Sequence, residues 1–290
     1  MESIVKIKDL TKSYKKSRGV ENINIEIEKG TIYGFIGPNG AGKSTTIKCI
    51  MNMINKNSGD IYIDSKLMTR SNNKIKEKIG YLPSEIHLYD DLTVKKMLDY
   101  SASFYKKDCT KRKDELVKRL EIDTAKKINE LSLGNLKKVG IVLAIMHEPE
   151  FIIMDEATSA LDPLMQEIFY EILSEEKKKG TTIFFSSHML NEVKRICDKV
   201  AIIKEGKIIR IDDIQKLNDS SFVKVKLTSK EVDDIIDDIN ITISNKKGNE
   251  IEFIYKDDIN DFIKKLSKYE VSKVLIEEPN IEEIFINYYK

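Results

Sequence analysis

The first part of the chain alternates apolar and polar positions in the manner of β-strands. Ile23, Ile25 and Ile27 are separated by polar residues, and this two-residue period is typical of a half-exposed antiparallel strand. Residues 31–36 are more continuously apolar, as expected of a buried strand. Residues 43–54 then carry apolar side chains at helical spacing. The pattern predicts strands, a glycine-rich loop at residues 37–42, and a helix.

The middle of the chain changes from helices to an alternation of strands and helices. Residues 92–131 are helical in pattern and rich in lysine, without heptads sustained enough for a coiled coil. Five predicted elements follow: strand 151–154, helix 163–179, strand 181–186, helix 190–198 and strand 200–203. Strands that alternate with helices favour a parallel sheet, so this part predicts an α/β fold.

A new series of strand and helix patterns begins near residue 218. This predicts a domain boundary between residues 1–218 and 219–290. The predicted order in the second part is a strand from 223, a short helix near 232–236, strands at 239–243 and 251–255, a helix at 259–266 and a strand at 274–276. This β-α-β-β-α-β order is typical of a ferredoxin-like fold, so a small α+β accessory domain is expected. A last helix is predicted to follow, capped by Asn280 with Glu283 three residues later.

Composition and charge restrict the classes of protein that fit this pattern. The 290 residues are 41% apolar and carry a formal net charge of +1, so nothing in the bulk charge indicates nucleic acid or anionic lipid. The three cysteines are widely spaced and form no CxxC pair, which favours reduced thiols in a cytosolic protein. No secretory signal and no apolar run of about 18 residues is present. Any role at a membrane is therefore expected to need a partner chain.

The strongest chemical signal is the run Gly-Pro-Asn-Gly-Ala-Gly-Lys-Ser at positions 37–44, between a predicted strand and a predicted helix. Glycines there let backbone N–H groups converge on phosphate oxygens, and the helix N-terminus favours negative charge. Lys43 is expected to reach the β- and γ-phosphates, Ser44 to bind Mg²⁺, and Thr45 to touch the α-phosphate. The candidate ATP-binding residues of this P-loop are Gly37, Asn39, Gly40, Gly42, Lys43, Ser44 and Thr45.

Two adjacent carboxylates follow the apolar residues 151–154. Asp155 is expected to bind Mg²⁺, and Glu156 to act as the general base, a role that contributes about 10²- to 10⁴-fold in rate. Such a pair alone would suit a solvated turn, and the P-loop upstream favours the catalytic interpretation. His188 also ends an apolar strand, where the residues alone favour a structural histidine over a catalytic one.

A family resemblance joins these motifs. The run Leu131-Ser132-Leu133-Gly134-Asn135 resembles the LSGGQ signature of ATP-binding-cassette (ABC) ATPases. The other matching segments are Tyr14 (adenine stacking), Ile79–Pro83 (entry to the Q-loop), Asp155–Pro163 (Walker B and D-loop) and Ser186-Ser187-His188 (H-loop). The motifs occur in the family's order and the resemblance spans about residues 3–212.

The resemblance implies a P-loop NTPase core with an antiparallel β subdomain and a helical subdomain at about residues 86–145. It implies a homodimer that forms on ATP binding, with each ATP between one P-loop and the other subunit's signature. Ser132 and the Gly134 N–H would meet the γ-phosphate in trans, and His188 would contact it in cis. Asp162, in the D-loop, is expected among the nucleotide-binding residues, as is Tyr14.

Three positions depart from the family pattern. Ser84 occupies the Q-loop glutamine position and is too short to reach Mg²⁺ or water as a glutamine would, although Glu85 is adjacent. Leu133 and Asn135 replace a glycine and a glutamine of the signature, which predicts weaker trans contacts. Ala157 replaces the usual proline after Glu156, and this change is expected to be tolerated.

The resemblance is greatest to ATPases of ABC-2-type drug, bacitracin and lantibiotic exporters. It implies an ATPase subunit at the inner face of the cell membrane, cytoplasmic and held there by a separate integral membrane permease. The permease is expected to contact residues 84–100, where Leu88, Tyr89, Leu92 and Val94 offer an apolar patch. The alternatives are an importer ATPase with a regulatory C-terminal domain, and an ABC-type ATPase acting on nucleic acid or ribosomes. The near-neutral charge disfavours nucleic acid as a partner.

Overall fold

The computed structural model describes residues 2–15, 19–69, 72–215, 223–239, 241, 243–255 and 257–277. The chain forms two compact units, Met1–Asp213 and Ile214–Lys290, which are described one at a time. The predicted boundary after residue 218 and the predicted terminal helix with Asn280 and Glu283 lie outside the described residues.

The first unit is built on a six-stranded sheet in the order β10-β9-β3-β8-β7-β6. Its strands are β3 (Ile32–Ile36), β6 (Ile79–Leu82), β7 (Phe151–Asp155), β8 (Thr182–Ser187), β9 (Lys199–Lys204) and β10 (Lys207–Asp213). All neighbours are parallel except β10, which pairs antiparallel with β9. Because parallel strands end on the same edge, the segments that follow β3, β7 and β8 meet there. This is the predicted α/β sheet.

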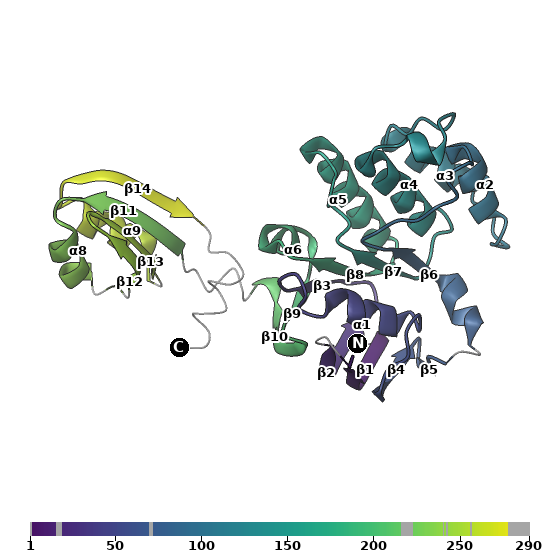
Figure 1. Cartoon of the computed structure of the whole chain (residues 1–290), viewed down its shortest axis with the longest axis horizontal. Coiled ribbons are helices and arrows are strands. Elements are labelled where there is room, and N and C mark those ends of the chain that lie inside the picture. The colour runs from purple at the N-terminus through teal and green to yellow at the C-terminus, as the bar shows by residue number, and fades with distance from the viewer. Residues whose placement is uncertain are drawn as a thin grey trace. The chain divides into compact units, whose positions relative to one another are not determined.

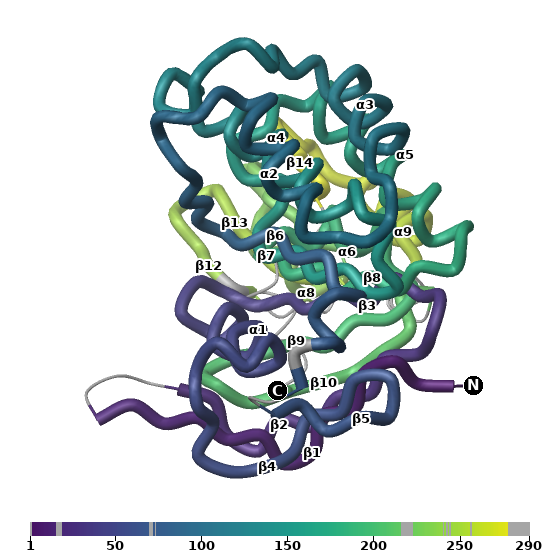
Figure 2. The backbone as a smooth tube through the Cα atoms, turned by 90° about the vertical axis from the view of Figure 1, so that its right-hand side faces the viewer, coloured from purple at the N-terminus to yellow at the C-terminus, as the bar shows by residue number. Residues whose placement is uncertain are grey.

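A second, antiparallel sheet of order β2-β1-β4-β5 covers one face of this core. Its strands are β1 (Ser3–Lys12), β2 (Val20–Glu28), β4 (Ser58–Ile63) and β5 (Lys66–Leu67). Helix α1 (Lys43–Ile50) lies between the two sheets (Figure 2), and its Ile47 and Ile50 belong to a core cluster drawn from both. The helix is shorter than predicted, because Asn52 adopts a left-handed conformation (φ 51°) just after it.

The other face of the central sheet is covered by helices (Figure 1). They are α2 (Val94–Ala102), α3 (Thr110–Arg119), α4 (Leu133–Ile145), α5 (Pro163–Lys178) and α6 (Leu190–Ile196), with the short 3₁₀ helix η2 (Ile128–Glu130). Another 3₁₀ helix, η1 (Asn73–Lys78), lies on the side of the antiparallel sheet, where its Ile75 joins the core cluster shared by both sheets. Helix α4 packs so closely on strand β6 that position 80 has no room for a side chain. A side chain at Gly80 in β6 would lie 2.0 Å from the carbonyl oxygen of Ala144 in α4.

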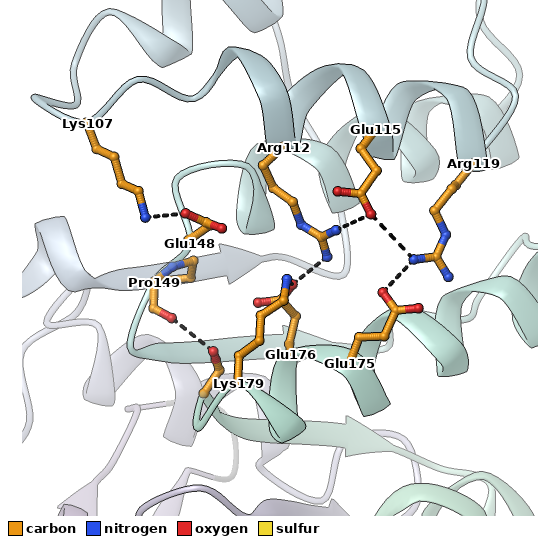
Figure 3. Close-up of polar contacts among 10 residues, drawn as sticks. Lys107, Arg112, Glu115, Arg119, Glu148, Pro149, Glu175, Glu176 and Lys179 are labelled. Carbon is orange, nitrogen blue, oxygen red and sulfur yellow. Dashed lines mark hydrogen bonds and ion pairs between the residues drawn. The ribbon is translucent and has the colours of Figure 1, made fainter.

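Ion pairs join α3 to the C-terminal end of α5 (Figure 3). The guanidinium of Arg112 contacts Glu115 at 2.7 Å and also pairs with Glu176. Arg112 and Glu176 are buried, with 6% and 1% of their side chains exposed. Removal of one partner would leave the other charge buried and unpaired. Substitution of either Arg112 or Glu176 alone is therefore expected to destabilise the packing of α3 on α5.

The C-terminal unit has the predicted β-α-β-β-α-β order. Its elements are β11 (Val223–Ser229), α8 (Val232–Ile239), β12 (Ile243–Lys247), β13 (Glu250–Tyr255), α9 (Ile259–Leu266) and β14 (Val271–Glu277). The strands pair antiparallel in the order β12-β13-β11-β14, as in a ferredoxin-like fold. The second strand begins at Ile243 instead of at residue 239 as predicted, because Val232, Ile235 and Ile239 are buried at helical spacing and extend α8.

Candidate functional site

The loop 37–42 joins β3 to α1 and its shape requires glycine at two positions. Gly42 precedes the helix with a φ of +109°, which L side chains rarely adopt. A side chain at Gly37 would lie 2.2 Å from the carbonyl oxygen of Ile203. Asn39 and Gly40 are exposed, whereas Ser44 and Thr45 at the start of α1 are half-buried. The loop thus presents exposed backbone ahead of a helix N-terminus.

Lys43 lies at the centre of this loop. Its side chain is 6% exposed, and its Nζ donates hydrogen bonds to the carbonyl oxygens of Gly37 (2.6 Å) and Pro38 (3.2 Å). The same ammonium lies 3.2 Å from Oε1 of Glu156. The loop therefore surrounds the ammonium group of Lys43. The carboxylate that pairs with it, Glu156, follows strand β7.

The two adjacent carboxylates take different positions at the end of β7. Asp155 is 1% exposed, and its Oδ1 accepts a hydrogen bond from Ser186 Oγ of β8 at 2.9 Å. Glu156 adopts a φ of +51°, uncommon for a residue other than glycine, and its N–H donates to the carbonyl oxygen of Ser186 (3.1 Å). Its Oε2 lies 2.6 Å from Nδ1 of His188. Glu156 thus bridges Lys43 and His188.

A polar network supports the segment that carries His188. The Ser187 hydroxyl donates to Glu192, and the Tyr170 hydroxyl donates to the other carboxylate oxygen of Glu192 at 3.2 Å. The N–H of Met189 donates to Ser187 Oγ at 2.9 Å. His188 itself is 48% exposed above this network. Neither Glu192 nor Tyr170 was predicted, because their sequence positions do not indicate that they meet Ser187.

A buried lysine that sequence analysis missed holds the Q-loop position. Lys137 of α4 is 4% exposed, and its Nζ donates to the carbonyl oxygens of Ser84 (3.1 Å) and Pro83 (3.4 Å). Burial lowers the pKa of Lys137, while the charges of Asp155 and Glu156 act in the opposite direction. Ser84, at the predicted Q-loop position, is therefore fixed through its backbone.

The signature residues lie at the start of α4. The Ser132 Oγ accepts a hydrogen bond from the N–H of Asn135 at 3.3 Å and so caps the helix. A side chain at Gly134 would lie 2.6 Å from the carbonyl oxygen of Ala160, so this helix end packs against the 155–163 run. Leu133 is 77% exposed. Within the described part of the chain, no hydrogen bond or ion pair joins Ser132 or Gly134 to the Lys43 cluster.

Two other predicted nucleotide-binding residues also lie at the surface. The Tyr14 side chain is 40% exposed, and Lys12 Nζ lies 4.9 Å from its ring centroid. Asp162 is exposed and caps α5, because its Oδ1 accepts a hydrogen bond from the N–H of Met165 at 3.0 Å. No contact in the described chain joins either of them to Lys43, Glu156 or His188.

The donor set of the site suits a cation that keeps water and phosphate ligands. Among the described residues, no three His, Cys, Asp or Glu side chains are grouped to hold a metal ion. Asp155 and Ser44 offer one carboxylate and one hydroxyl, and Mg²⁺ is usually bound by one or two carboxylates with substrate phosphates. These residues fit Mg²⁺ together with a nucleotide. Over the described ranges, no helix is both long and apolar enough to cross a membrane.

Sequence comparisons agree with this geometry. The family model described as "ABC transporter" matches residues 20–159. The chain is 37% identical over 225 residues to the bacitracin transport ATP-binding protein BcrA of Bacillus licheniformis, covering 75% of this chain and 73% of that one. It is 27% identical over 308 residues to the linearmycin resistance ATP-binding protein LnrL of Bacillus subtilis strain 168, covering 98% and 97%.

Solved structures of ABC ATPases resemble the fold of this chain. An ATP-binding subunit of an ABC transporter superposes with a TM-score of 0.70 at 28% identity, covering 75% of this chain and 92% of that one. The dimeric post-hydrolysis state of the cassette MJ0796, bound to ADP and phosphate, gives a TM-score of 0.66 at 25% identity over 72% and 98%. The predicted P-loop ABC fold is confirmed. The chain belongs to the ABC transporter family and is an ATP-binding subunit that hydrolyses ATP.

Proposed function

We propose that the protein is the ATP-hydrolysing subunit of a membrane exporter whose transmembrane subunit is a separate chain. The observation that carries the proposal is the similarity to the linearmycin resistance protein, which extends over 98% of this chain. The similarity to the bacitracin transport protein gives further support. Membrane association at the cytoplasmic face would then come from the partner chain.

ATP would bind where β3 ends. The phosphates would be held by the backbone N–H groups of residues Gly37, Asn39, Gly40 and Gly42 and by the side chains of Lys43, Ser44 and Thr45. Tyr14, half-exposed beside Lys12, would stack on the adenine. Asp155 and Ser44 would hold Mg²⁺, which supplies charge neutralisation for the phosphate oxygens.

The Lys43–Glu156–His188 cluster supports a division of labour in hydrolysis. In the structure, the Glu156 carboxylate neutralises Lys43. A bound phosphate would provide Lys43 with another anionic partner, so Glu156 would become available to orient the attacking water and accept its proton. His188, hydrogen-bonded to Glu156, would contact the γ-phosphate.

A second copy of the chain would complete the site. Ser132 and the Gly134 N–H are separate from the cluster of their own chain and lie at a helix N-terminus suited to an anion. They would therefore contact the γ-phosphate held by the other copy, with Asp162 nearby in the D-loop. The dimeric state of MJ0796 is consistent with this arrangement.

The permease would contact an exposed aromatic surface near α2. The Tyr89 and Tyr100 ring centroids lie 5.8 Å apart, those of Tyr100 and Phe104 lie 5.0 Å apart, and all three side chains are exposed. Of the patch predicted from the sequence, Tyr89 is exposed, and Leu88 and Leu92 are half-buried. Val94 does not belong to it, because its side chain is fully buried.

Affinity purification from mildly solubilised cells tests the exporter proposal. The tagged wild-type chain should recover an integral membrane protein, and a variant with Tyr89→Ala and Phe104→Ala should recover less of it. Leu164→Ala, at another exposed apolar position, is the matched control. Recovery of ribosomes or DNA without a membrane protein would contradict the proposal. A recovered permease that imports its substrate would favour the importer alternative.

A further inference from the structure

The two edges of the C-terminal sheet differ in chemistry. Figure 1 shows β14 along one edge and β12 along the other. Strand β12 is polar, carries Lys246 and Lys247, and has a register shift against β13 between Ile243 and Asn245. Lysines and bulges at an edge strand hinder pairing with other chains. Strand β12 therefore has the features of a protected edge.

Strand β14 carries a lysine, Lys273, and a register shift against β11 between Val271 and Lys273, but both lie in its first half and leave the rest of the edge regular. Within the sheet formed by the described residues 223–277, β14 pairs only with β11, so its other edge has no strand partner. Three consecutive apolar side chains are exposed there, Val274 (44%), Leu275 (40%) and Ile276 (38%). From Lys273 to Glu277 the pairing with β11 runs without a register shift. An apolar, regular edge of this kind is a template for another strand.

The register with β11 shows which face each side chain joins. Val274 pairs with Leu227 and Ile276 with Val225, both of which are fully buried in the core of the unit. Leu275 pairs with Lys226, and these two side chains lie on the opposite face of the sheet. Lys273 and Glu277, two residues to either side of Leu275, lie on that same face. An added strand would continue the apolar layer on the core side of the sheet.

The sequence of β14 is self-complementary about Leu275. In an antiparallel pair of two copies centred on this residue, Leu275 lies opposite Leu275, and Val274 lies opposite Ile276. Lys273 of each copy then lies opposite Glu277 of the other, which places two opposite-charge pairs on one face. The charge pattern thus favours a second copy of the same strand as the occupant of the edge.

We propose that two copies of this chain associate through antiparallel pairing of their β14 strands, forming one continuous eight-stranded sheet from two four-stranded ones. The contact is short, so its dissociation constant alone is expected on the order of micromolar to millimolar. It needs no nucleotide and is separate from the ATP-dependent contact. When ATP holds the same two copies together, the β14 contact would become intramolecular and its effective strength would rise.

Charge reversal tests the proposal with the full-length, nucleotide-free protein in sedimentation experiments over a concentration series. Lys273→Glu or Glu277→Lys alone replaces two attractive pairs by two repulsive ones, and each should weaken dimerisation about 4-fold or more. The double variant restores the opposite charges in swapped positions and should recover the wild-type dimer. Lys247→Glu, the same charge change on β12, is the control and should have no effect.

A second readout is hydrogen exchange of the β14 amides, which should slow as the wild-type protein concentration rises. A wild-type chain that stays monomeric over the whole series would overturn the proposal. So would a double variant that dimerises no better than the single variants. Amide protection that does not depend on concentration would show that the same chain covers the edge. All of these outcomes are independent of ATP, so they leave the proposed function untouched.

Discussion

The two units bury different kinds of side chain. Among the described residues of the first unit, seven basic or acidic side chains are buried: Lys43, Arg112, Lys137, His147, Asp155, Glu176 and Glu192. In the described part of the C-terminal unit no Lys, Arg, His, Asp or Glu side chain is buried, and the buried Ser229 hydroxyl donates a hydrogen bond to the carbonyl oxygen of Glu270 at 2.7 Å. The C-terminal core is otherwise apolar.

The difference in buried charge corresponds to the proposed roles of the two units, catalysis for the first and association with a second copy for the C-terminal one. A buried charge is costly unless it is paired, so a fold retains it where the charge is used or holds another group in position. Lys43 and Asp155 lie in the proposed catalytic site, and Lys137 and Glu192 hold the segments beside it. The C-terminal unit has no such group among its described residues, and its distinctive feature is an exposed strand edge.

The separate apolar core predicts that the C-terminal unit can be weakened without loss of nucleotide binding. Phe253 is fully buried against Phe262, with ring centroids 5.9 Å apart. Phe253→Ala should cost about 3–5 kcal/mol in that unit. Thermal unfolding should show an earlier transition while ATP affinity stays unchanged. A matching loss of ATP affinity would mean that the two units are energetically coupled.

The buried histidine predicts that acid sensitivity belongs to the first unit. Burial lowers the pKa of His147 to about 4, and its ring stacks on Tyr105 at 4.1 Å. Between about pH 6.5 and 4 the unfolded chain binds a proton that the folded chain does not, so stability falls as pH falls, by up to about 3 kcal/mol. His147→Phe should flatten this decline in denaturant titrations, and His87→Phe, at an exposed site, should not.

The P-loop lysine tests whether buried charge in the first unit serves the nucleotide. Lys43→Ala should weaken ATP binding about 10- to 100-fold, because charge-assisted hydrogen bonds to phosphate are lost. Isothermal titration with Mg²⁺ and ATP measures the change. Lys48→Ala, at an exposed position of the same helix, is the control and should bind normally. Unchanged affinity in Lys43→Ala would contradict the P-loop assignment.

The smallest effect is expected at Tyr14, an exposed position of the first unit. Tyr14→Ala should cost about 0.5–1.5 kcal/mol of stacking on adenine. The affinity for ATP should fall while that for inorganic triphosphate, which has no base to stack, should stay the same. If both affinities fall together, Tyr14 acts through the phosphates or the fold.

Much of the proposed site could be predicted because its residues follow strands. Asp155, Glu156 and His188 lie at or just after the ends of apolar strands, Lys43 follows the glycine-rich loop after another, and parallel strands end on one edge of the sheet. The order of the strands could not be read in this way. Ser186 reaches Asp155 because β8 lies between β3 and β7, a tertiary fact that no local pattern encodes.

The features that were missed depend on contacts between distant segments. Lys137 holds Ser84, and Arg112 pairs with Glu176, although each pair is far apart in the sequence. A lysine or arginine on a helix normally indicates a solvated face, and only packing shows that these two are buried. In the C-terminal unit, helical burial at Ile239 overrode a strand prediction made from a short apolar run.

In the proposed mechanism, one chain supplies a catalytic half-site that a second copy completes when ATP binds. The direct measurement compares Glu156→Gln with Glu150→Gln, the same change just before the other end of β7, at a concentration where the nucleotide-free protein is monomeric. Glu156→Gln should lower turnover about 10²- to 10⁴-fold, retain ATP binding and form a stable dimer with ATP and Mg²⁺. Glu150→Gln should hydrolyse ATP normally. A Glu156→Gln variant that hydrolyses ATP at the wild-type rate, or that binds ATP and stays monomeric, would contradict the proposal that two copies complete the site.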